Sequence, residues 1–274
     1  MVFKPTTKAN LQTAINGWLD ETIVADTTIG SVFGDASQSS EGFYNEPIGN
    51  MSSWNVTLVD DFSNLFKDKT TFTGSGTQSI NGWGDDGDLA VTTIESMFEG
   101  CTNFVGSGLD YFETWNTPNL TTVKNAFKGA VKFNDKVDAF LKDGNKVTDM
   151  EGFLHGATLW NNGYAQPDEE LPMSAADDFF YQPNWYTNKV TTMKNLFRGS
   201  AFNQGFPIDT ASGTVDRFNT HLVQSFEGTF AELGGFNQIL GFLNTSSART
   251  MKEMFKDSPK FNDGEFLGIG CWNV

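Results

Sequence analysis

The chain has 274 residues, with 18 basic and 34 acidic side chains and a formal net charge of −16 at pH 7. A surface this acidic repels phosphate groups, so the composition argues against nucleic acid and anionic lipid as partners. No run of about 18 apolar residues occurs, so no segment is expected to span or insert into a membrane. The two cysteines, Cys101 and Cys271, cannot form a disulfide framework or a four-ligand zinc site, and Cys101 is expected in the core.

Residues 1–50 differ in composition from the rest and are expected to form an N-terminal capping helix and a loop. Thr6 or Thr7 can cap a helix that runs to about Asp20. Its apolar residues fall on one stripe: Leu11, Ala14, Ile15, Trp18 and Leu19. Such a helix would cover the first hydrophobic face of a repeat array. Residues 27–47 are rich in Ser, Gly, Thr and acidic residues and are expected to be a loop.

A pattern then recurs from Trp54 onwards, and residues 51–274 are expected to form a repeat domain of about seven units. An apolar residue is followed by others three and seven positions later, and then by an aromatic residue that often precedes Asn. The first apolar positions are Val59, Val91, Leu120, Val147, Val190, Val223 and Ala248. The spacing between units varies from 25 to 43 residues, and the longest interval contains an insertion near 162–184.

The spacing of three and seven residues places apolar side chains on one face of a short helix. Threonines after the first apolar position can act as N-caps, and glycines at the far end can stop the helix: Thr92, Thr121, Thr148 and Thr191, with Gly100, Gly129, Gly156 and Gly199. Short apolar stretches such as Val137 are expected to form stacked parallel strands. The predicted fold is therefore an α/β solenoid of leucine-rich-repeat-like coils, each a short strand plus a short helix.

An asparagine recurs after the trailing aromatic residue, at Asn134, Asn161, Asn203, Asn237 and Asn262. Stacked coils would bring these residues into one column. Their amides are expected to satisfy backbone groups at a turn, and a row of ligand-binding amides is the alternative. The aromatic residues that recur five positions before the first apolar residue (Trp54, Trp115, Trp185 and Phe218) are expected mainly in the core.

These motifs resemble the bacterial surface protein repeat family, the BspA-like repeats related to leucine-rich repeats. The resemblance rests on Trp54-Asn55-Val56, on Val190-Thr-Thr-Met193 with Leu196-Phe197, and on Phe202-Asn203-Gln204. It extends over nearly the whole chain. It implies a solenoid with roles in surface display, adhesion or particle decoration, and it brings no shared catalytic residues.

One glycine-rich stretch, Gly82-Trp-Gly-Asp-Asp-Gly87, formally matches a dinucleotide-binding fingerprint. The aspartates between its glycines would repel a pyrophosphate, and the stretch does not lie between a strand and a helix. Its carboxylates Asp85, Asp86 and Asp88 are a candidate calcium site, and a solvated acidic turn is the alternative. No other metal site and no cofactor are expected.

Catalysis finds little support in the sequence. His155 and His221 are the only histidines, neither lies near a nucleophile elbow or a metal-ligand pattern, and His155 is expected to be exposed. Paired carboxylates are plentiful in so acidic a chain, but no pair stands out as a glycosidase site. The chain is therefore not predicted to be an enzyme, although a carbohydrate-active protein is a distant alternative.

The predicted function is a non-enzymatic, extracellular or virion-surface interaction protein that presents loops to a protein partner or a host-surface glycan. The start of the chain has no apolar signal segment, so a virion component, for decoration or tail association, is preferred over a bacterial cell-surface adhesin. Candidate contact residues are Phe179, Phe180, Tyr181 and Trp185, at the end of the insertion, and local packing of the insertion is the alternative. The final Cys271-Trp272-Asn273-Val274 repeats the start of a unit, so an open C-terminal end could dock another subunit.

Overall fold

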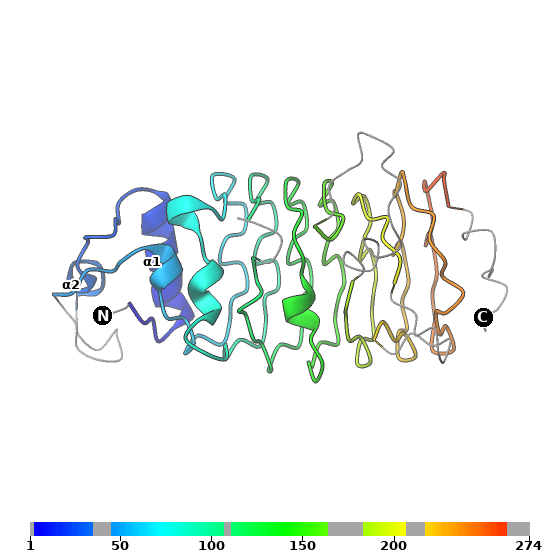
Figure 1. The fold of residues 1–274 in the computed structure, drawn as a ribbon, viewed down its shortest axis with the longest axis horizontal. Coiled ribbons are helices and arrows are strands. Elements are labelled where there is room, and N and C mark those ends of the chain that lie inside the picture. Colours follow the sequence, from blue (N-terminus) through cyan, green and yellow to red (C-terminus); the bar gives the residue numbers. More distant parts are fainter. Residues whose placement is uncertain (1–2, 35–44, 107–110, 164–182, 207–216, 262–274) are drawn as a thin grey trace.

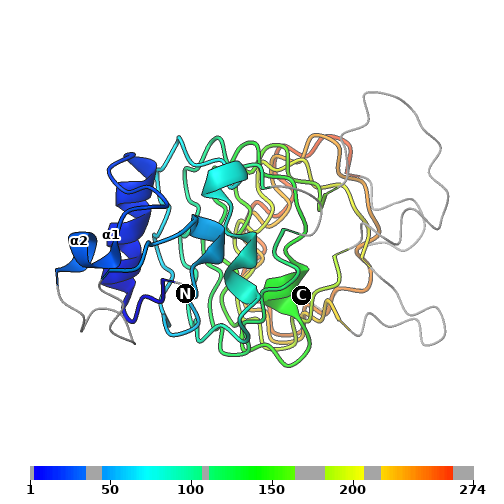
Figure 2. The same cartoon turned by 60° about the vertical axis from the view of Figure 1, so that its left-hand side comes forward.

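The computed structural model describes residues 3–34, 45–106, 111–163, 183–206 and 217–261. The chain forms an elongated stack in which successive turns lie side by side, with the helical N-terminal region at one end (Figures 1 and 2). Two α-helices are present in the described residues, α1 (Lys8–Leu19) and α2 (Ile29–Phe33). The same residues also contain the 3-10 helices η2 (Met51–Ser53), η3 (Gly76–Gln78), η4 (Asn81–Gly84) and η5 (Asp138–Leu141).

The predicted α/β architecture is wrong. In the described residues the repeats contain neither α-helices nor β-strands, and most of the backbone is irregular. What joins successive units is a series of isolated parallel bridges, one residue per unit: Asp61, Thr93, Thr122, Asp149, Thr192, Ser225 and Thr250. The expected helix of each unit is replaced by tight turns that follow this bridge residue. We call each unit a coil, counted from the one that contains Asp61.

Hydrogen bonds between coils hold the turns in register. In the first coil, alternate N–H groups donate to carbonyls of the second coil: Phe62 to Thr93, Asn64 to Glu95, Phe66 to Met97 and Asp68 to Glu99, at 2.7–3.0 Å. The intervening N–H groups bond within the coil, as from Lys67 to Asn64 O at 3.1 Å. The corresponding donors of later coils repeat this arrangement as far as Glu232 N to Lys256 O at 2.7 Å. Backbone groups that a helix would pair internally are thus satisfied by the neighbouring coil.

Two residues in each coil adopt a positive φ, which no α-helix allows. The first position holds Asn64, Ser96, Asn125, Gly152, Asn195, Gly228 and Glu253, with φ of 53–61°. The second, four residues later, holds Asp68, Gly100, Gly129, Gly156, Gly199, Glu232 and Asp257. Glycine and asparagine tolerate this left-handed conformation best, which explains their recurrence at these sites. The repeated glycines are therefore turn residues inside the unit and do not terminate helices.

The predicted threonine N-caps are also replaced by another structure. The bridge residue itself accepts a hydrogen bond from the N–H two residues later, as in Asp149 Oδ1 with Glu151 N at 2.8 Å. Thr93 and Thr122 do the same with their hydroxyls, at 3.1 Å. These are turns closed by a side chain, a local alternative to helix. The threonines predicted as N-caps instead bond to the preceding coil, as in Thr121 Oγ1 to Thr92 O at 2.9 Å.

The core contains two parallel columns of stacked aromatic rings. In one column Phe98 lies 5.5 Å from Phe66 and 5.1 Å from Phe127, measured between ring centroids. The trailing aromatic residues form the other column, as in Phe104 and Phe133 at 5.1 Å. Most of these rings are fully buried: Phe66, Phe72, Phe98, Phe104, Phe127, Phe133, Phe197, Phe202 and Phe236 are 0% exposed. In the last coil Phe255 and Phe261 are only half-buried. The repeated phenylalanines therefore form much of the core.

The asparagine column has the structural role that was predicted. Asn134 Oδ1 accepts from Asn161 N at 2.8 Å, and Asn161 Oδ1 accepts from Asn203 N at 2.9 Å. Asn203 Oδ1 then accepts from Asn237 N at 3.1 Å. Each side chain thus binds the backbone of the next coil, and Asn262 lies outside the described residues.

The predicted N-terminal helix is present as α1, with Thr7 Oγ1 accepting from Asn10 N at 3.2 Å as its N-cap. It lies against the first coil: Gln12 Nε2 donates to Leu65 O at 2.9 Å, and Lys8 Nζ lies 3.0 Å from Asp61 Oδ1. The helix therefore satisfies an edge carbonyl to which no preceding coil donates. Within the segment 27–47, expected to be a loop, the short helix α2 forms.

Candidate functional site

The outer side of the turns carries a column of alternating charge. From the second coil on, the residue two positions after the bridge is Glu95, Lys124, Glu151, Lys194, Glu227 and Lys252 in successive coils. Lys124 Nζ lies 3.2 Å from Glu151 Oε2, and Lys194 Nζ lies 3.7 Å from Glu227 Oε1. Because opposite charges face each other only when neighbouring coils are in register, this column favours the observed stacking.

A second charged column runs beside the first and contains His155. Glu99 lies between Lys67 and Lys128, at 3.0 and 3.3 Å. Burial raises the pKa of Glu99, but hydrogen bonds from Ser96 and from both lysines outweigh it and leave the pKa below its usual value. His155 is half-buried, contrary to the prediction that it is exposed. Burial, then the charges of Lys128 and Arg198, lower its pKa.

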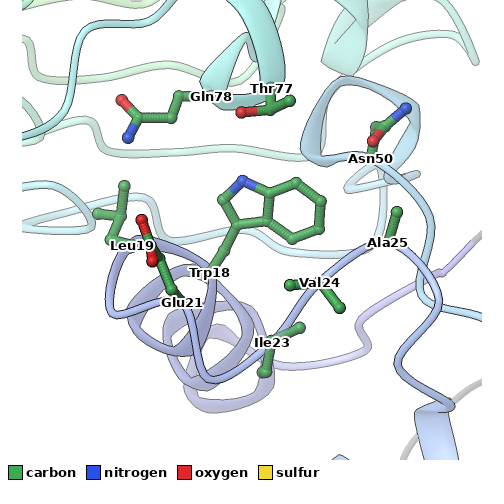
Figure 3. A pocket seen from close by; sticks show the side chains of 9 residues that line it. All are labelled: Trp18, Leu19, Glu21, Ile23, Val24, Ala25, Asn50, Thr77 and Gln78. Carbon is green, nitrogen blue, oxygen red and sulfur yellow. The ribbon is translucent and has the colours of Figure 1, made fainter.

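A pocket lies where α1 meets the first coils, and we call it the cap pocket. Its volume is about 410 Å³, and nine residues line it: Trp18, Leu19, Glu21, Ile23, Val24, Ala25, Asn50, Thr77 and Gln78 (Figure 3). They come from the end of α1, the segment after it, the start of η2 and the 3-10 helix η3. The volume falls within the range of roughly 300–1,000 Å³ found for small-molecule sites.

The end of α1 determines the shape of one wall. Glu21 adopts a φ of 57°, and the N–H groups of Thr22 and Ile23 both donate to Gly17 O at 2.9 Å. This closes the helix and turns the chain back over it. A Cβ on Gly17 would lie 2.4 Å from Ile23 Cδ1, so the side chain of Ile23 would have to move to admit it. Val24, 55% exposed, is then left as an apolar group at the pocket.

Trp18 provides the aromatic surface of the cap pocket. Its ring is only half-buried and packs edge to face on the fully buried Trp54, with centroids 5.8 Å apart. The other tryptophans in the described residues are 0% exposed: Trp54, Trp83, Trp115, Trp160 and Trp185. In Figure 3 the indole lies between Gln78 and Thr77 on one side and Val24 and Ile23 on the other. Trp18 is therefore fixed by the core and still accessible to a ligand.

Gln78 presents a donor to the pocket in a fixed orientation. Its Oε1 accepts from Thr73 N at 2.8 Å and from Thr73 Oγ1 at 3.2 Å. With the oxygen bound in this way, Nε2 is the atom left for a ligand, and Figure 3 shows it directed toward the pocket. No acceptor for Gln78 Nε2 or for Trp18 Nε1 is found among the residues described. The pocket thus offers two N–H donors, one of them on the indole ring itself.

Another hollow, of about 350 Å³, is lined by Phe112, Glu113, Lys136, Asp138, Ala139 and Lys142. Here the cation of Lys142 already donates to the carbonyls of Glu113 and Trp115, both at 3.3 Å. Phe112 is only 1% exposed and offers little ring surface. The cap pocket is the better candidate because it combines an accessible ring with available donors.

A sequence model of one family covers almost the whole chain. The family is described as "Mycoplasma protein of unknown function, DUF285", and it matches residues 2–104, 77–184 and 173–274. The chain belongs to this family. Its three matches are tandem repeats of the family pattern. No curated protein and no solved structure matches the chain.

The family assignment corrects the resemblance drawn from the motifs. No BspA-like or leucine-rich-repeat family matches, and DUF285 does. The tryptophan, valine-threonine and phenylalanine-asparagine motifs are real features of the DUF285 chain. In its structure they form turns, aromatic columns and amide ladders, and the strand-plus-helix coil that the resemblance implied is absent from the described residues.

The acidic stretch near residue 85 has a structural explanation. A Cβ on Gly82 would lie 2.3 Å from Ser52 O, and one on Gly84 would lie 2.3 Å from Thr114 O. These glycines allow coils to approach closely. The candidate metal ligands Asp85, Asp86 and Asp88 are exposed, and Asp88 Oδ1 accepts from Asn116 Nδ2 at 2.6 Å. Within the described residues no group of three or more His, Cys, Asp or Glu side chains could hold a metal ion.

The structure describes only one of the four predicted contact residues, Trp185. Phe179, Phe180 and Tyr181 lie outside the described residues, as do Cys271 and the rest of the C-terminal end predicted to be open. Trp185 is 0% exposed and stacks on Phe197 at 5.7 Å, so it occupies the core position expected of its column.

Cys101 is a core thiol, as predicted. It is fully buried, and its Sγ lies 2.8 Å from Phe66 O. Burial raises its pKa to about 12. In the described part of the chain, no helix is long and apolar enough to cross a membrane.

The cap pocket was not predicted from the sequence. Trp18 was assigned to the apolar stripe of the helix, and Asn50, Thr77 and Gln78 belong to no repeated position. The sequence contained one indication of the pocket. Trp18 and Leu19 are the last apolar residues of the helix, and the earlier ones already cover the core-facing side. A bulky residue there has less core to bury it.

Proposed function

We propose that this protein is a non-enzymatic surface interaction protein whose cap pocket binds a ligand displayed by a partner. The observation that carries the proposal is the cap pocket, in which a half-buried Trp18 lies beside the oriented amide of Gln78. An apolar hollow with a few convergent polar groups is the usual form of a binding site. The stacked coils would act as a rigid support that displays it.

Two settings remain for this function, a virion component and a cell-surface adhesin. The family description favours the second, because it names Mycoplasma proteins, and these belong to a cellular organism. Both settings place the protein outside the cell, where a host-surface protein or glycan would be the partner. The strong negative charge of the chain supports a partner that is not anionic.

Binding of the fluorescently labelled full chain to cultured animal cells tests the proposal by flow cytometry. We expect saturable binding that falls at least tenfold when the donor is removed in Gln78→Glu. The control Gln224→Glu adds the same charge at an exposed site next to the bridge residue Ser225 and should bind like the parent. Binding of Gln78→Glu as strong as that of Gln224→Glu and the parent would overturn the proposal. Turnover of a glycan substrate that a single carboxylate change abolishes would also overturn it.

A further inference from the structure

We infer that the cap pocket recognises a neutral sugar residue, a ligand class that rests on the function proposed above. The inference follows from three properties of the lining residues: the accessible indole, the mixture of donors and acceptors, and the absence of basic side chains among them. Each property excludes a different kind of ligand.

The indole calls for a ligand with an apolar face. Trp18 presents its ring within a hollow whose other apolar groups are Leu19, Ile23, Val24 and Ala25 (Figure 3). The C–H face of a pyranose ring can pack on an aromatic ring and remove both surfaces from water. Small ions and strongly hydrated ligands have no such face. The ring is also held in place, because its packing against Trp54 limits its rotation.

The polar groups call for a ligand that both donates and accepts. Gln78 Nε2 and Trp18 Nε1 are donors, Glu21 carries acceptor oxygens, and the Asn50 amide and Thr77 hydroxyl can do either. These groups surround the apolar surface and do not gather at one point. A sugar matches this arrangement, since hydroxyl groups radiate from its ring and each can donate or accept. A purely aliphatic ligand would take these donors away from water and leave them unpaired, which opposes its binding.

The charges exclude acidic sugars. Of the nine lining residues Glu21 alone is charged, and it is negative. A carboxylated, sulfated or phosphorylated sugar would meet no cation in the pocket and would be repelled by a chain of net charge −16. The selected class is therefore neutral hexoses and N-acetylhexosamines.

The test is a titration of the full chain, labelled with ¹⁵N, with glucose, galactose, mannose and their N-acetylated amines, followed by NMR. We expect a neutral sugar to shift the indole N–H resonance of Trp18 in a saturable manner. The buried indoles of Trp83 and Trp160, which donate to Met51 O and Asp135 O, should not move. N-acetylneuraminate, an acidic sugar, should produce no shift.

Two variants connect the shift to the pocket. Gln78→Glu keeps an oxygen for Thr73 N but removes the donor, so the dissociation constant should rise about tenfold, the factor expected from one lost hydrogen bond. Thr77→Val alters only one hydroxyl on an exposed residue and should weaken binding less. The control Gln224→Glu should bind like the parent. Unchanged melting temperatures show that the variants fold.

Three results would overturn the inference: no shift with any neutral sugar at 50-fold molar excess and above, a shift that Gln78→Glu leaves unchanged, or stronger binding of N-acetylneuraminate. If the sugars fail but cell binding still depends on Gln78, the ligand class is wrong and the proposed function stands. If cell binding is also independent of Gln78, both proposals fall.

Discussion

Replacing Phe127 by alanine tests the aromatic columns at their centre. Phe127 is 0% exposed, and its ring lies 4.3 Å from that of Phe133 and 5.1 Å from that of Phe98. Truncating a buried phenylalanine to alanine costs about 3–5 kcal/mol. The ring also bridges neighbouring coils, because it lies 5.5 Å from Phe153 of the next one. We therefore expect a loss in the upper part of that range, about 4–5 kcal/mol.

The chain itself supplies the control for this experiment. The next coil has Leu154 at the equivalent position, also fully buried. A Phe127→Leu variant places the residue of the next coil at this position and should cost clearly less than the alanine variant, because leucine fills most of the space that alanine leaves empty. Urea unfolding followed by tryptophan fluorescence measures both free energies, with Trp115 and Trp160 reporting from nearby coils. An alanine variant that loses less than about 1 kcal/mol, or a leucine variant as unstable as the alanine one, would refute this reasoning.

Three further predictions concern close approach and charge. Gly84→Ala should lower the melting temperature clearly in a thermal scan, because its Cβ would lie 2.3 Å from the backbone oxygen of Thr114; an unchanged melting temperature would contradict the contact. Lys124→Glu should lower the unfolding free energy by about 1 kcal/mol in low salt, because the new carboxylate would face Glu151. The decrease should be smaller in high salt, because salt screens the repulsion between the two carboxylates. The depressed pKa of Glu99 gives stability that is fully present above its ordinary pKa of about 4.5 and is lost as the pH falls through the lower folded value. The difference in unfolding free energy between the parent and Glu99→Gln should therefore be constant near pH 7 and shrink below pH 4.5, and a difference independent of pH would exclude this role.

The repeat register, the buried aromatic positions and the asparagine ladder could all be predicted from the sequence. They depend on residue identity at fixed intervals, and stacked coils bring equal positions together whatever the local backbone is. Asn134 and Asn161, for example, are placed in one column by their position after the trailing aromatic residue. Which backbone atom each amide binds then follows from the stacking.

The local conformation could not be predicted, because apolar spacings of three and seven residues suit two structures. In a helix they mark one face of 3.6-residue turns. In this chain Phe62 and Phe66 lie four residues apart because two tight turns follow each other, with positive φ at Asn64 and Asp68. The useful signal was the position that Asn64 occupies in the first coil. Five of the seven coils have Asn or Gly at this position. These are poor helix formers and good left-handed residues.

The cap pocket could not be predicted because its residues come from segments that the repeat does not relate. Trp18 reaches Asn50 and Gln78 only through the packing of α1 on the first coils. Nothing in the spacing of these residues fixes their distance. The orientation of Gln78 depends further on its hydrogen bonds to Thr73.

The stability of Gly152→Ala tests the turn-built stack most directly, because a helical repeat and a turn repeat predict opposite signs. Gly152 lies at the first left-handed position with a φ of 61°, and a Cβ there would lie 2.2 Å from Asn125 Oδ1. In a short helix the change to alanine would stabilise by about 0.8–1.0 kcal/mol. In the turn it should destabilise by about 1–2 kcal/mol from the backbone alone. The control Gly144→Ala, with a φ of 78° and open space around the added Cβ, measures that backbone cost without the contact.

Equilibrium urea unfolding of the parent and the two variants gives the answer. The turn-built stack predicts that both alanine variants are less stable than the parent and that Gly152→Ala is at least as destabilised as Gly144→Ala. An increase in the unfolding free energy of Gly152→Ala would contradict it.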